Sequence, residues 1–505
     1  MSRKSSENLL YYGDNLQVLR HYIKDETIDL IYLDPPFNSD QNYNIIFQEQ
    51  NGSRSKSQIK AFKDTWRWDK ESAEAYYDMV EHGPDSLSRV MQAFRTMIGE
   101  SDLLAYLSMM APRLVELHRV LKPEGSIYLH CDPTASHYLK LLMDAIFNPK
   151  DFLNEIIWHY RKWPTGKYAF QRNHDIIFFY SKSSSKERVF NQLYMPRAES
   201  TLKRFGNAKI RSGYDKDGNR IPSQMEEEES LGVRQDDVWD IGRVPPVKQL
   251  FPTQKPIKLL KRIIEASTHN GDTVLDPFCG CGTTILGCQE MKRRWIGIDI
   301  THLSITLIKH RLLDGYGKRA KYKVLGEPVS LPDAKSLAEE DPWQFQWWAL
   351  GLVGARPIEQ KKGADKGIDG RLYFYDEARK NKTKQVIISV KAGHTGPNHI
   401  RDLRGVIERE DAAIGVLISM NSPTKSMTTE AASAGFYHSP GFNTNFSRIQ
   451  ILTIKDLFEG KTINYPSQSN VTFKRGLDTD ISYSEKESLF PEMEANEYNG
   501  DEPPE

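Results

Sequence analysis

The sequence predicts an α/β protein with two domains, the first built around a parallel sheet with helices on both faces. The chain has 505 residues, which is too long for one ordinary hydrophobic core. Strand-like apolar runs alternate with amphipathic helical segments from Asn8 to about Phe147, and the alternation returns between residues 254 and 313. A second α/β pattern runs from Trp343 to about Tyr465.

Each element of the first domain is predicted from its apolar periodicity and from the turn residues that bound it. Short runs of β-branched and aromatic residues indicate strands, whereas apolar residues repeating every three or four positions indicate helices. The expected strands are 8–14, 29–34, 123–132, 272–278 and 294–300, and the expected helices are 15–23, 102–122, 135–147, 254–267, 282–291 and 302–313.

Composition suggests where the domains begin and end. The region between the two alternating halves is basic, with 14 Lys/Arg against 7 Asp/Glu in residues 151–220. Glycine, proline and mixed charge suggest a linker before the second pattern. We expect a first domain at 1–320 with an insertion at 38–100 and a second interrupting region at 159–250, a linker at 321–340, a second domain at 341–465, and an acidic, disordered tail at 466–505.

The composition also argues against several classes of protein. No uninterrupted apolar run approaches the roughly 18 residues of a membrane helix, so we expect no membrane association. The first residues lack the apolar core of a secretion signal. Four cysteines in 505 residues cannot form a disulfide framework, and a reducing cytoplasm is the expected location.

A glycine-containing loop follows the strand that ends at Asp276. Gly280 and Gly282 lie between this strand and an apolar helix, where glycine lets the backbone approach a ligand closely. Asp299 ends the next strand, 19 residues after Gly280, at the spacing of a carboxylate that binds ribose hydroxyls. The alternative is a tight turn without a ligand. No phosphate-binding P-loop is present, and we expect no metal at this loop.

Asp34, Pro35, Pro36 and Phe37 come directly after another buried strand. An amine conjugated to an aromatic ring is a poor nucleophile because its lone pair is delocalised. A carboxylate and a backbone carbonyl held by proline can accept its two hydrogens, and an aromatic ring can stack on the base. Such a base must first leave the duplex. The alternative is a strand end at the prolines, with Phe37 in the core.

The tetrapeptide and the run "DPFCGCGTT" together resemble the β class of S-adenosylmethionine-dependent DNA amino-methyltransferases. In this class the catalytic tetrapeptide precedes the cofactor loop, and a target-recognition region lies between the two halves. The resemblance also covers "YYGD", which ends at Asp14, and "FPTQKPIKLLKRII", which begins at Phe251. It implies a Rossmann-like methyltransferase domain with an inserted target-recognition region at 159–250.

The resemblance assigns roles to individual residues. Asp34, Pro35, Pro36 and Phe37 are the implied catalytic residues. The implied cofactor-binding residues are Asp14, Thr253, Gln254, Lys255, Asp276, Pro277, Phe278, Gly280, Gly282, Thr283 and Asp299, with Thr253, Gln254 and Lys255 beside the cofactor carboxylate. Aspartate in the first position is typical of enzymes that methylate N6 of adenine, whereas serine is typical of N4-cytosine enzymes. Methylation of adenine in double-stranded DNA is therefore the implied activity, and N4-cytosine is the alternative.

Basic side chains in the region between the halves are the candidate DNA contacts, because lysine and arginine supply much of the affinity for phosphate. These candidates are Arg161, Lys162, Arg172, Lys203, Arg204 and Arg211. The sequence leaves the recognition site open, and we expect a monomer or a homodimer.

The second domain resembles the PD-(D/E)xK nuclease fold, most closely the Mrr-type restriction endonucleases. Asp369 begins one apolar strand and Lys391 ends the next, as the resemblance requires for a Mg²⁺ site and a lysine beside the attacking water. Ser389 stands where the family has an acidic or polar ligand, and Glu359 is a candidate replacement. An active nuclease in a bifunctional restriction-modification enzyme, an inactive DNA-binding domain and an unrelated fold all stay open. A DNA-binding protein without catalysis, or an RNA or protein methyltransferase, fits the first domain less well.

Overall fold

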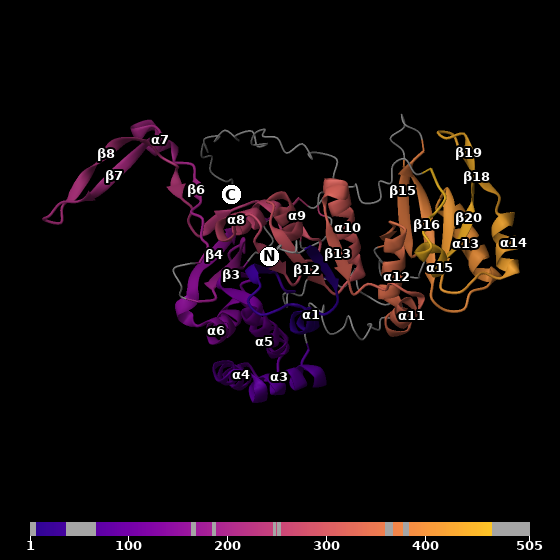
Figure 1. Ribbon diagram of the computed structural model, residues 1–505, viewed down its shortest axis with the longest axis horizontal. Coiled ribbons are helices and arrows are strands. Elements are labelled where there is room, and N and C mark those ends of the chain that lie inside the picture. The colour runs from indigo at the N-terminus through magenta and orange to yellow at the C-terminus, as the bar shows by residue number, and fades with distance from the viewer. Residues whose placement is uncertain are drawn as a thin grey trace, which may run out of the picture.

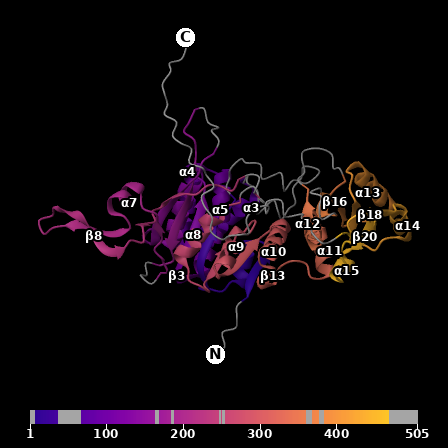
Figure 2. The same ribbon diagram turned by 90° about the horizontal axis from the view of Figure 1, so that it is seen from above.

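The computed structural model describes residues 7–36, 67–162, 168–183, 188–245, 249, 254–358, 367–376 and 383–466. Over these residues the chain forms two bodies, each with its own large sheet, and an arm that projects from the first body (Figures 1 and 2). Within the described ranges, none of the helices combines the length and apolarity that a membrane span requires.

The first body is built on a sheet with nine described strands. Their order across the sheet is β10 (Val238–Asp240), β4 (Phe152–His159), β5 (His174–Ser181), β3 (Leu121–Cys131), β2 (Ile28–Leu33), β11 (Thr273–Asp276), β12 (Arg294–Asp299), β1 (Asn8–Tyr12) and β13 (Tyr322–Leu325). The five predicted strands are all present. The sheet is mixed rather than wholly parallel, because β5 runs antiparallel to both β3 and β4.

The strand order brings together two segments that are far apart in the sequence. Strand β2 pairs in parallel with β11, with Leu30 opposite Val274 and Ile31 opposite Leu275. The carboxyl ends of these neighbouring strands therefore lie side by side at the same edge of the sheet. In open α/β sheets this edge is where ligands bind.

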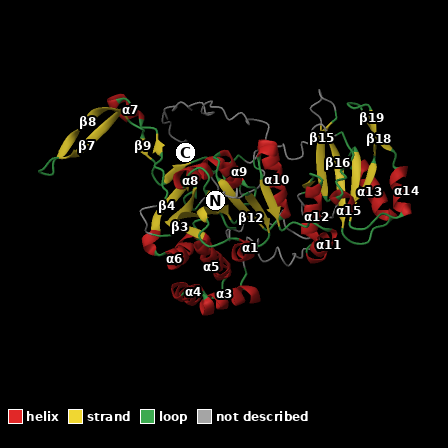
Figure 3. Ribbon diagram, in the orientation of Figure 1, coloured by secondary structure: helices red, strands yellow, loops and turns green. Residues whose placement is uncertain are grey.

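Helices cover both faces of this sheet, as predicted (Figure 3). One face carries α1 (Asn15–Tyr22), α3 (Lys70–His82), α4 (Asp85–Ile98), α5 (Asp102–Val120) and α6 (Ser136–Phe147), and the other carries α8 (Ile257–Ser267), α9 (Thr283–Glu290) and α10 (His302–Tyr316). Two short 3₁₀ helices, Pro149–Asp151 and Gly317–Arg319, complete this part.

The two predicted interruptions differ in structure. In the expected insertion at 38–100, residues 70–98 form α3 and α4, whose buried side chains pack on the core below. Residues 38–66 lie outside the described part. The second region, 159–250, contributes β5 and β10 to the main sheet. It also supplies the arm, which consists of β6 (Tyr194–Met195), α7 (Glu199–Phe205), β7 (Ala208–Tyr214), β8 (Arg220–Glu229) and β9 (Val233–Arg234).

The second body contains a five-stranded sheet, a two-stranded ribbon and helices on both sides. The sheet order is β14 (Arg356–Pro357), β15 (Gly370–Tyr375), β16 (Thr383–Lys391), β17 (Ile414–Ser419) and β20 (Ile449–Thr453), and the ribbon is β18 (Phe436–Ser439) with β19 (Thr444–Ser447). Its helices are α11 (Leu331–Glu340), α12 (Pro342–Leu352), α13 (Pro397–Arg409), α14 (Lys425–Ser433) and α15 (Ile454–Phe458).

The expected linker at 321–340 is wrong. Tyr322–Leu325 form β13, which pairs in parallel with β1 at the edge of the first sheet. Leu331–Glu340 form α11, which begins at the N-cap Ser330 and buries Ala334 in the second core. Helix α12 follows directly and is apolar on nearly all sides because it packs between α10 of the first body and the second sheet.

Candidate active site

The carboxyl ends of β2 and β11 carry two of the predicted site residues. Asp34 follows β2 directly, and Asp276 is the last residue of β11. Pro35 is buried and Pro36 half-buried after Asp34, whereas Phe37 lies outside the described residues. The two sequence motifs, separated by most of the first domain, thus meet at one edge of the sheet.

The two oxygens of Asp34 have different surroundings. Oδ2 accepts a short hydrogen bond from Nζ of Lys255. Oδ1 is buried and has no hydrogen-bond partner among the described residues, and Nδ1 of His130 lies 3.9 Å away. A buried carboxylate oxygen without a donor is unusual, because most buried polar atoms are paired. Asp34 therefore has one oxygen held in place and one open to a donor from a ligand.

Lys255 is expected beside the cofactor carboxylate, and in the structure its ammonium group contacts Asp34. The side chains of Lys255 and Asp34 are only 12% and 17% exposed, so this ion pair is largely shielded from water. Gln254 precedes Lys255 at the start of the segment that leads into α8. Thr253 lies outside the described residues.

The glycine loop after β11 has the conformation that its sequence suggests. Gly280 and Gly282 have φ angles of +48° and +75°, which favour glycine. A side chain at Gly282 would also meet Ile308 at 2.6 Å, so this position needs glycine for packing as well. The backbone N–H of Gly280 donates to Oδ2 of Asp299 at 2.9 Å, and this bond ties the loop to the end of β12. Thr283 begins α9 and is buried.

Burial raises the pKa of both loop carboxyl groups. The pKa of Asp276 rises from 3.8 to about 7, although hydrogen bonds from Thr284 and Phe278 oppose the shift. The pKa of Asp299 rises from 3.8 to about 6, opposed by hydrogen bonds from Thr301 and from the backbone of Gly280. These acids are therefore ready to ionise when a positively charged group arrives.

Asp14 occupies the N-cap of α1 and also contacts a buried arginine. Its Oδ1 accepts from the backbone of Leu16 at 2.9 Å, and its Oδ2 accepts from Nη2 of Arg113 at 2.6 Å. Arg113 donates to Asn15 as well, and Asn15 donates to the carbonyl of Pro277 at 2.8 Å. This network links the first strand, α5 and the glycine loop. Sequence reasoning missed Arg113 and Asn15, because neither stands in a recognisable motif.

A small cavity of about 10 Å³ lies between these segments. Its lining contains four predicted residues, Asp14, Pro277, Phe278 and Asp299. Gly13, Asn15, Arg113 and Ile300 complete the lining. The predicted cofactor residues at the ends of β1, β11 and β12 therefore surround one space.

The candidate DNA contacts are all exposed, but they form two groups. Arg161, Lys162 and Arg172 lie beside the ends of β4 and β5 on the first body. Lys203 and Arg204 lie on α7 and Arg211 on β7, all in the arm. The structure thus separates a basic cluster near the sheet from a basic cluster on α7 and β7. Figure 1 shows α7 and β7 on the projecting arm.

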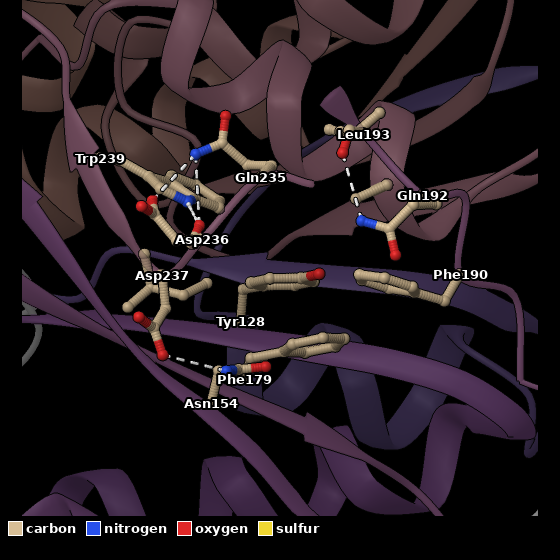
Figure 4. A pocket seen from close by; sticks show the side chains of 12 residues that line it. Tyr128, Asn154, Phe179, Phe190, Gln192, Leu193, Gln235, Asp236, Asp237 and Trp239 are labelled. Atoms are coloured by element: carbon tan, nitrogen blue, oxygen red, sulfur yellow. Dashed lines mark hydrogen bonds between the residues drawn. The ribbon is translucent and has the colours of Figure 1, made fainter. Parts of the chain in front are cut away.

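A second cavity of about 190 Å³ contains none of the predicted site residues (Figure 4). Tyr128 and Phe179 are stacked on one side of it with ring centroids 4.3 Å apart. Amide and carboxylate side chains, including Gln192, Gln235 and Asp237, lie around them. The chain segments on either side of the arm supply part of this lining, so the cavity lies at the base of the arm.

The second body brings together three of the four predicted nuclease-like residues. Oδ2 of Asp369 accepts from Oγ of Ser389 at 3.1 Å, from the backbone of Val390 at 2.7 Å and from Nζ of Lys391 at 3.4 Å. Glu359 lies outside the described residues, beyond α12, which ends at Leu352. Within the described ranges, no group of three or more His, Cys, Asp or Glu side chains is placed to hold a metal, so the expected Mg²⁺ site gains no support.

This fold and site define a class of protein. The sequence model of the N6_N4_Mtase family, described as "DNA methylase", matches residues 28–310, which is more than half of the chain. The chain therefore belongs to this DNA methylase family. Residues 344–459 match a second family, described as "NACHT-associated inactive Restriction Endonuclease 1", which covers only the second body.

Curated relatives are similar to the first part of the chain. It is 26% identical over 333 residues to the type II methyltransferase M.BamHI of Bacillus amyloliquefaciens, a match that covers 63% of this chain and 59% of that protein. It is also 26% identical over 307 residues to the DNA adenine methyltransferase YhdJ of Escherichia coli, covering 60% of this chain and 82% of that protein. The first relatives are thus matched over only about 60% of their length.

Among solved structures, the chain is similar to a DNA modification methylase from Thermus thermophilus. The two share 17% identity with a TM-score of 0.35, and the match covers 63% of this chain and all of that one.

Proposed function

We propose that this chain transfers the methyl group of S-adenosylmethionine to the N6 amine of an adenine that has rotated out of double-stranded DNA. Membership of the DNA methylase family supports methyl transfer to DNA. The observation that carries the proposal is the open oxygen of Asp34, which is buried next to the glycine loop without a partner in the described part of the chain. An incoming amino group would supply the missing donor.

Asp34 and Pro35 suit the chemistry of such an amine. The nitrogen must lose conjugation with its ring before it can attack, and two acceptors for its hydrogens favour that geometry. Oδ1 of Asp34 supplies one acceptor, while Lys255 holds the other oxygen in place. Pro35 is a candidate for the second, through its carbonyl, because its ring fixes the backbone and leaves no N–H to compete. Positioning and electrostatics supply the acceleration, so no covalent intermediate is required.

The residues around the first cavity fit S-adenosylmethionine, which supplies an electrophilic methyl group when bound. Gly280 leaves room for close approach, since an added side chain there would meet only the Phe278 carbonyl, at 4.0 Å. Asp276 lies behind the loop and is placed to balance the positive charges of the methionine part. We assign Asp299 to the ribose hydroxyls and Asp14 and Phe278 to the adenosine site, because all three line the cavity. Gln254 and Thr253 are proposed for the carboxylate end.

DNA recognition is proposed for the two basic clusters. Arg161, Lys162 and Arg172 lie on the body near the strand ends, where they are suited to phosphate contacts. The arm is a two-stranded ribbon with a short helix, and β-ribbons fit the major groove. Arg211 and the α7 residues Lys203 and Arg204 would then contact the DNA away from the target base.

The aspartate of the tetrapeptide favours adenine, and a DNA adenine methyltransferase is among the relatives. N4-cytosine is the alternative, because its amine presents the same chemical problem and the family includes both activities in its name. The identity of the methylated nucleoside distinguishes the two activities.

We infer that the second body, which resembles Mrr-type nucleases in sequence order, does not cleave DNA. Ser389 and Lys391 both donate to Oδ2 of Asp369, and the matching family is described as inactive. A bifunctional restriction-modification enzyme is the competing interpretation, and it requires a divalent metal ion at Asp369.

Methyl transfer to DNA tests the proposal directly. Purified chain is incubated with tritium-labelled S-adenosylmethionine and unmethylated genomic DNA, and the digested nucleosides are separated by mass. Labelled N6-methyldeoxyadenosine is expected from the native chain and none from Asp34→Ala. Labelled N4-methyldeoxycytidine would replace the adenine assignment, and no label on any DNA would refute the proposal. A parallel incubation with Mg²⁺ and unmethylated DNA is expected to leave the DNA uncut.

A further inference from the structure

A buried network of side chains lies behind Asp34 that no motif predicted. His130 lies near the end of β3 with a fully buried ring, and Nε2 of the ring lies 3.2 Å from Oδ2 of Asp175 on β5. Asp175 also accepts from the hydroxyl of Tyr160 at 2.8 Å. On the other side, the hydroxyl of Tyr32 lies 3.0 Å from Nδ1 of His130. Asp34 stands next to this nitrogen, at 3.9 Å.

The charges around the ring fix which nitrogen carries hydrogen. Burial works against the charged form of Asp175. Its hydrogen bond with His130, the positive charges of Lys255 and of the imidazole in its protonated form, and its hydrogen bond with Tyr160 outweigh this effect and lower its pKa to about 2. Asp175 is therefore a carboxylate, which can only accept, so Nε2 of His130 carries the hydrogen. Burial and the charge of Asp34 raise the pKa of Tyr32 well above its ordinary value, so Tyr32 keeps its proton and donates to Nδ1.

This arrangement explains the open oxygen of Asp34. In a neutral ring held by Asp175 on one side, Nδ1 has no hydrogen to give, so Oδ1 of Asp34 faces an acceptor across 3.9 Å. Nδ1 can take a proton when the Tyr32 hydroxyl turns, so that the hydroxyl oxygen accepts from the new N–H instead of donating to Nδ1. An imidazolium formed there would lie between the carboxylates of Asp34 and Asp175, which stabilise its charge.

We propose that His130, held by Asp175, receives the proton that the target amine must lose. This rests on the proposed methyl transfer. The amine nitrogen forms its bond to the methyl carbon while the S–C bond breaks and the sulfur keeps the electron pair. The nitrogen then carries one proton too many. Oδ1 of Asp34 accepts it as the N–C bond forms and passes it to Nδ1 of His130. Asp175, 19% exposed, gives the network a route to solvent.

The groups that face the ring come from every element packed against it. Tyr32 and Asp34 come from β2 and its end, Asp175 from β5, and Tyr160 from the end of β4. Lys255, which contacts Asp34, precedes α8, and its charge also acts on Asp175. The ring edge meets Trp158 with centroids 5.4 Å apart, which keeps water away from that side. His130 is a positioning residue in this scheme, because Asp34 rather than His130 contacts the base.

The test is a pH profile of the single-turnover rate, which isolates the chemical step from product release. The native rate should rise with pH, because His130 must be unprotonated to accept. His130→Gln keeps a polar side chain toward Asp175 but cannot take up a proton. It should lower the rate about 100-fold, in the range of general-base effects, and flatten the pH dependence. Asp175→Asn should lower the rate less and shift the rise to lower pH, because an imidazolium would lose a stabilising carboxylate.

Two measurements keep the result interpretable. His159→Gln removes a similar histidine, paired with Asp240 at 3.2 Å on the surface, and should leave the rate and its pH dependence unchanged. Thermal unfolding and cofactor binding identify any variant whose fold is damaged as a whole. If His130→Gln is damaged in this way, the pH profile of Asp175→Asn tests the role of His130. A folded variant of either residue with the native pH profile would overturn the role of His130. A native chain without methyl transfer would instead refute the proposed function, and this inference with it.

Discussion

The two bodies of this chain each present a buried aspartate beside a lysine at a strand end, and the two carboxylates are in opposite states. Asp34 has one oxygen bound by Lys255 and the other without a partner among the residues that the structure describes. Asp369 has three donors from its own chain on a single oxygen. An unpaired buried acceptor costs stability unless a ligand satisfies it, whereas a carboxylate oxygen with donors from its own chain contributes to folding. The first arrangement is suited to a reaction and the second to structure.

Removal of the Asp34 side chain is the strongest test of the difference between the two aspartates. Asp34→Ala should lower the single-turnover rate of methyl transfer about 1,000-fold, the size of effect seen when one preorganised charge-stabilising group is lost. Cofactor affinity should hold, because Asp34 does not line the cofactor cavity. Asp34→Asn keeps an acceptor oxygen, so its single-turnover rate should fall less than that of Asp34→Ala. Equal rates for native chain and Asp34→Ala would show that the open oxygen plays no part.

The opposite change in the second body should affect stability alone. Asp369→Ala leaves Ser389, Val390 and Lys391 without their acceptor and should lower the free energy of unfolding of that body by about 1–3 kcal/mol. Chemical denaturation of the full chain measures it, with the exposed Asp402→Ala as the control, expected within about 0.5 kcal/mol of native. A folded Asp369→Ala with a large loss of methyl transfer would contradict the division between the two sites.

Sequence reasoning found Asp34 and the glycine loop because each is a local pattern at a strand end. It missed His130 and Asp175, because they meet only through the antiparallel pairing of β3 with β5. A polar residue near the end of an otherwise apolar strand was the available signal. The same limitation applied to Lys255, whose contact with Asp34 joins two segments that are distant in sequence.

The wrong linker and the unpredicted helices α3 and α4 had a different origin. β13 alternates half-buried and exposed residues at the sheet edge, and its polar composition resembles a linker when β1 is not known to lie beside it. Helices α3 and α4 contain apolar residues at helical spacing, among them Leu87, Met91 and Phe94, but the polar residues around them dominated the composition. Local composition could not reveal either contact with the core.

The raised pKa values of Asp276 and Asp299 predict that cofactor affinity depends on pH. Burial raises the pKa of Asp276 to about 7 and of Asp299 to about 6, so the protein without ligand keeps protons there that a free carboxyl group would lose near 3.8. A cationic ligand favours the ionised forms. Its affinity should therefore rise about tenfold between roughly pH 6 and pH 8, with release of protons. Calorimetry in two buffers with different ionisation heats measures both quantities.

The control for this prediction is Asp299→Asn, which cannot ionise and should bind more weakly with a shallower pH dependence. The same shifts affect stability with a definite sign. A carboxyl group with a raised folded pKa stabilises the fold at low pH, and this contribution is lost as the pH rises through about 6 to 7. Affinity that falls over this pH range would contradict the assignment of the two acids to the cofactor site.

The smallest expected effect is a difference in methyl transfer between variants of the two lysines, Lys255 and Lys391. Lys255→Met removes the donor that holds Oδ2 of Asp34, so the carboxylate can rotate, and methyl transfer should fall about fivefold, as expected for about 1 kcal/mol. Lys391→Met removes the weakest of three donors to Asp369, at 3.4 Å, and should leave methyl transfer unchanged. Both lysines lie beside a carboxylate, so each variant loses one positive charge in a similar position. A difference in activity between the variants therefore cannot come from the loss of charge alone. If the two variants lost activity equally, the effect of Lys255 would reflect overall charge or folding, and the fixed orientation of Asp34 would not be what the ion pair provides.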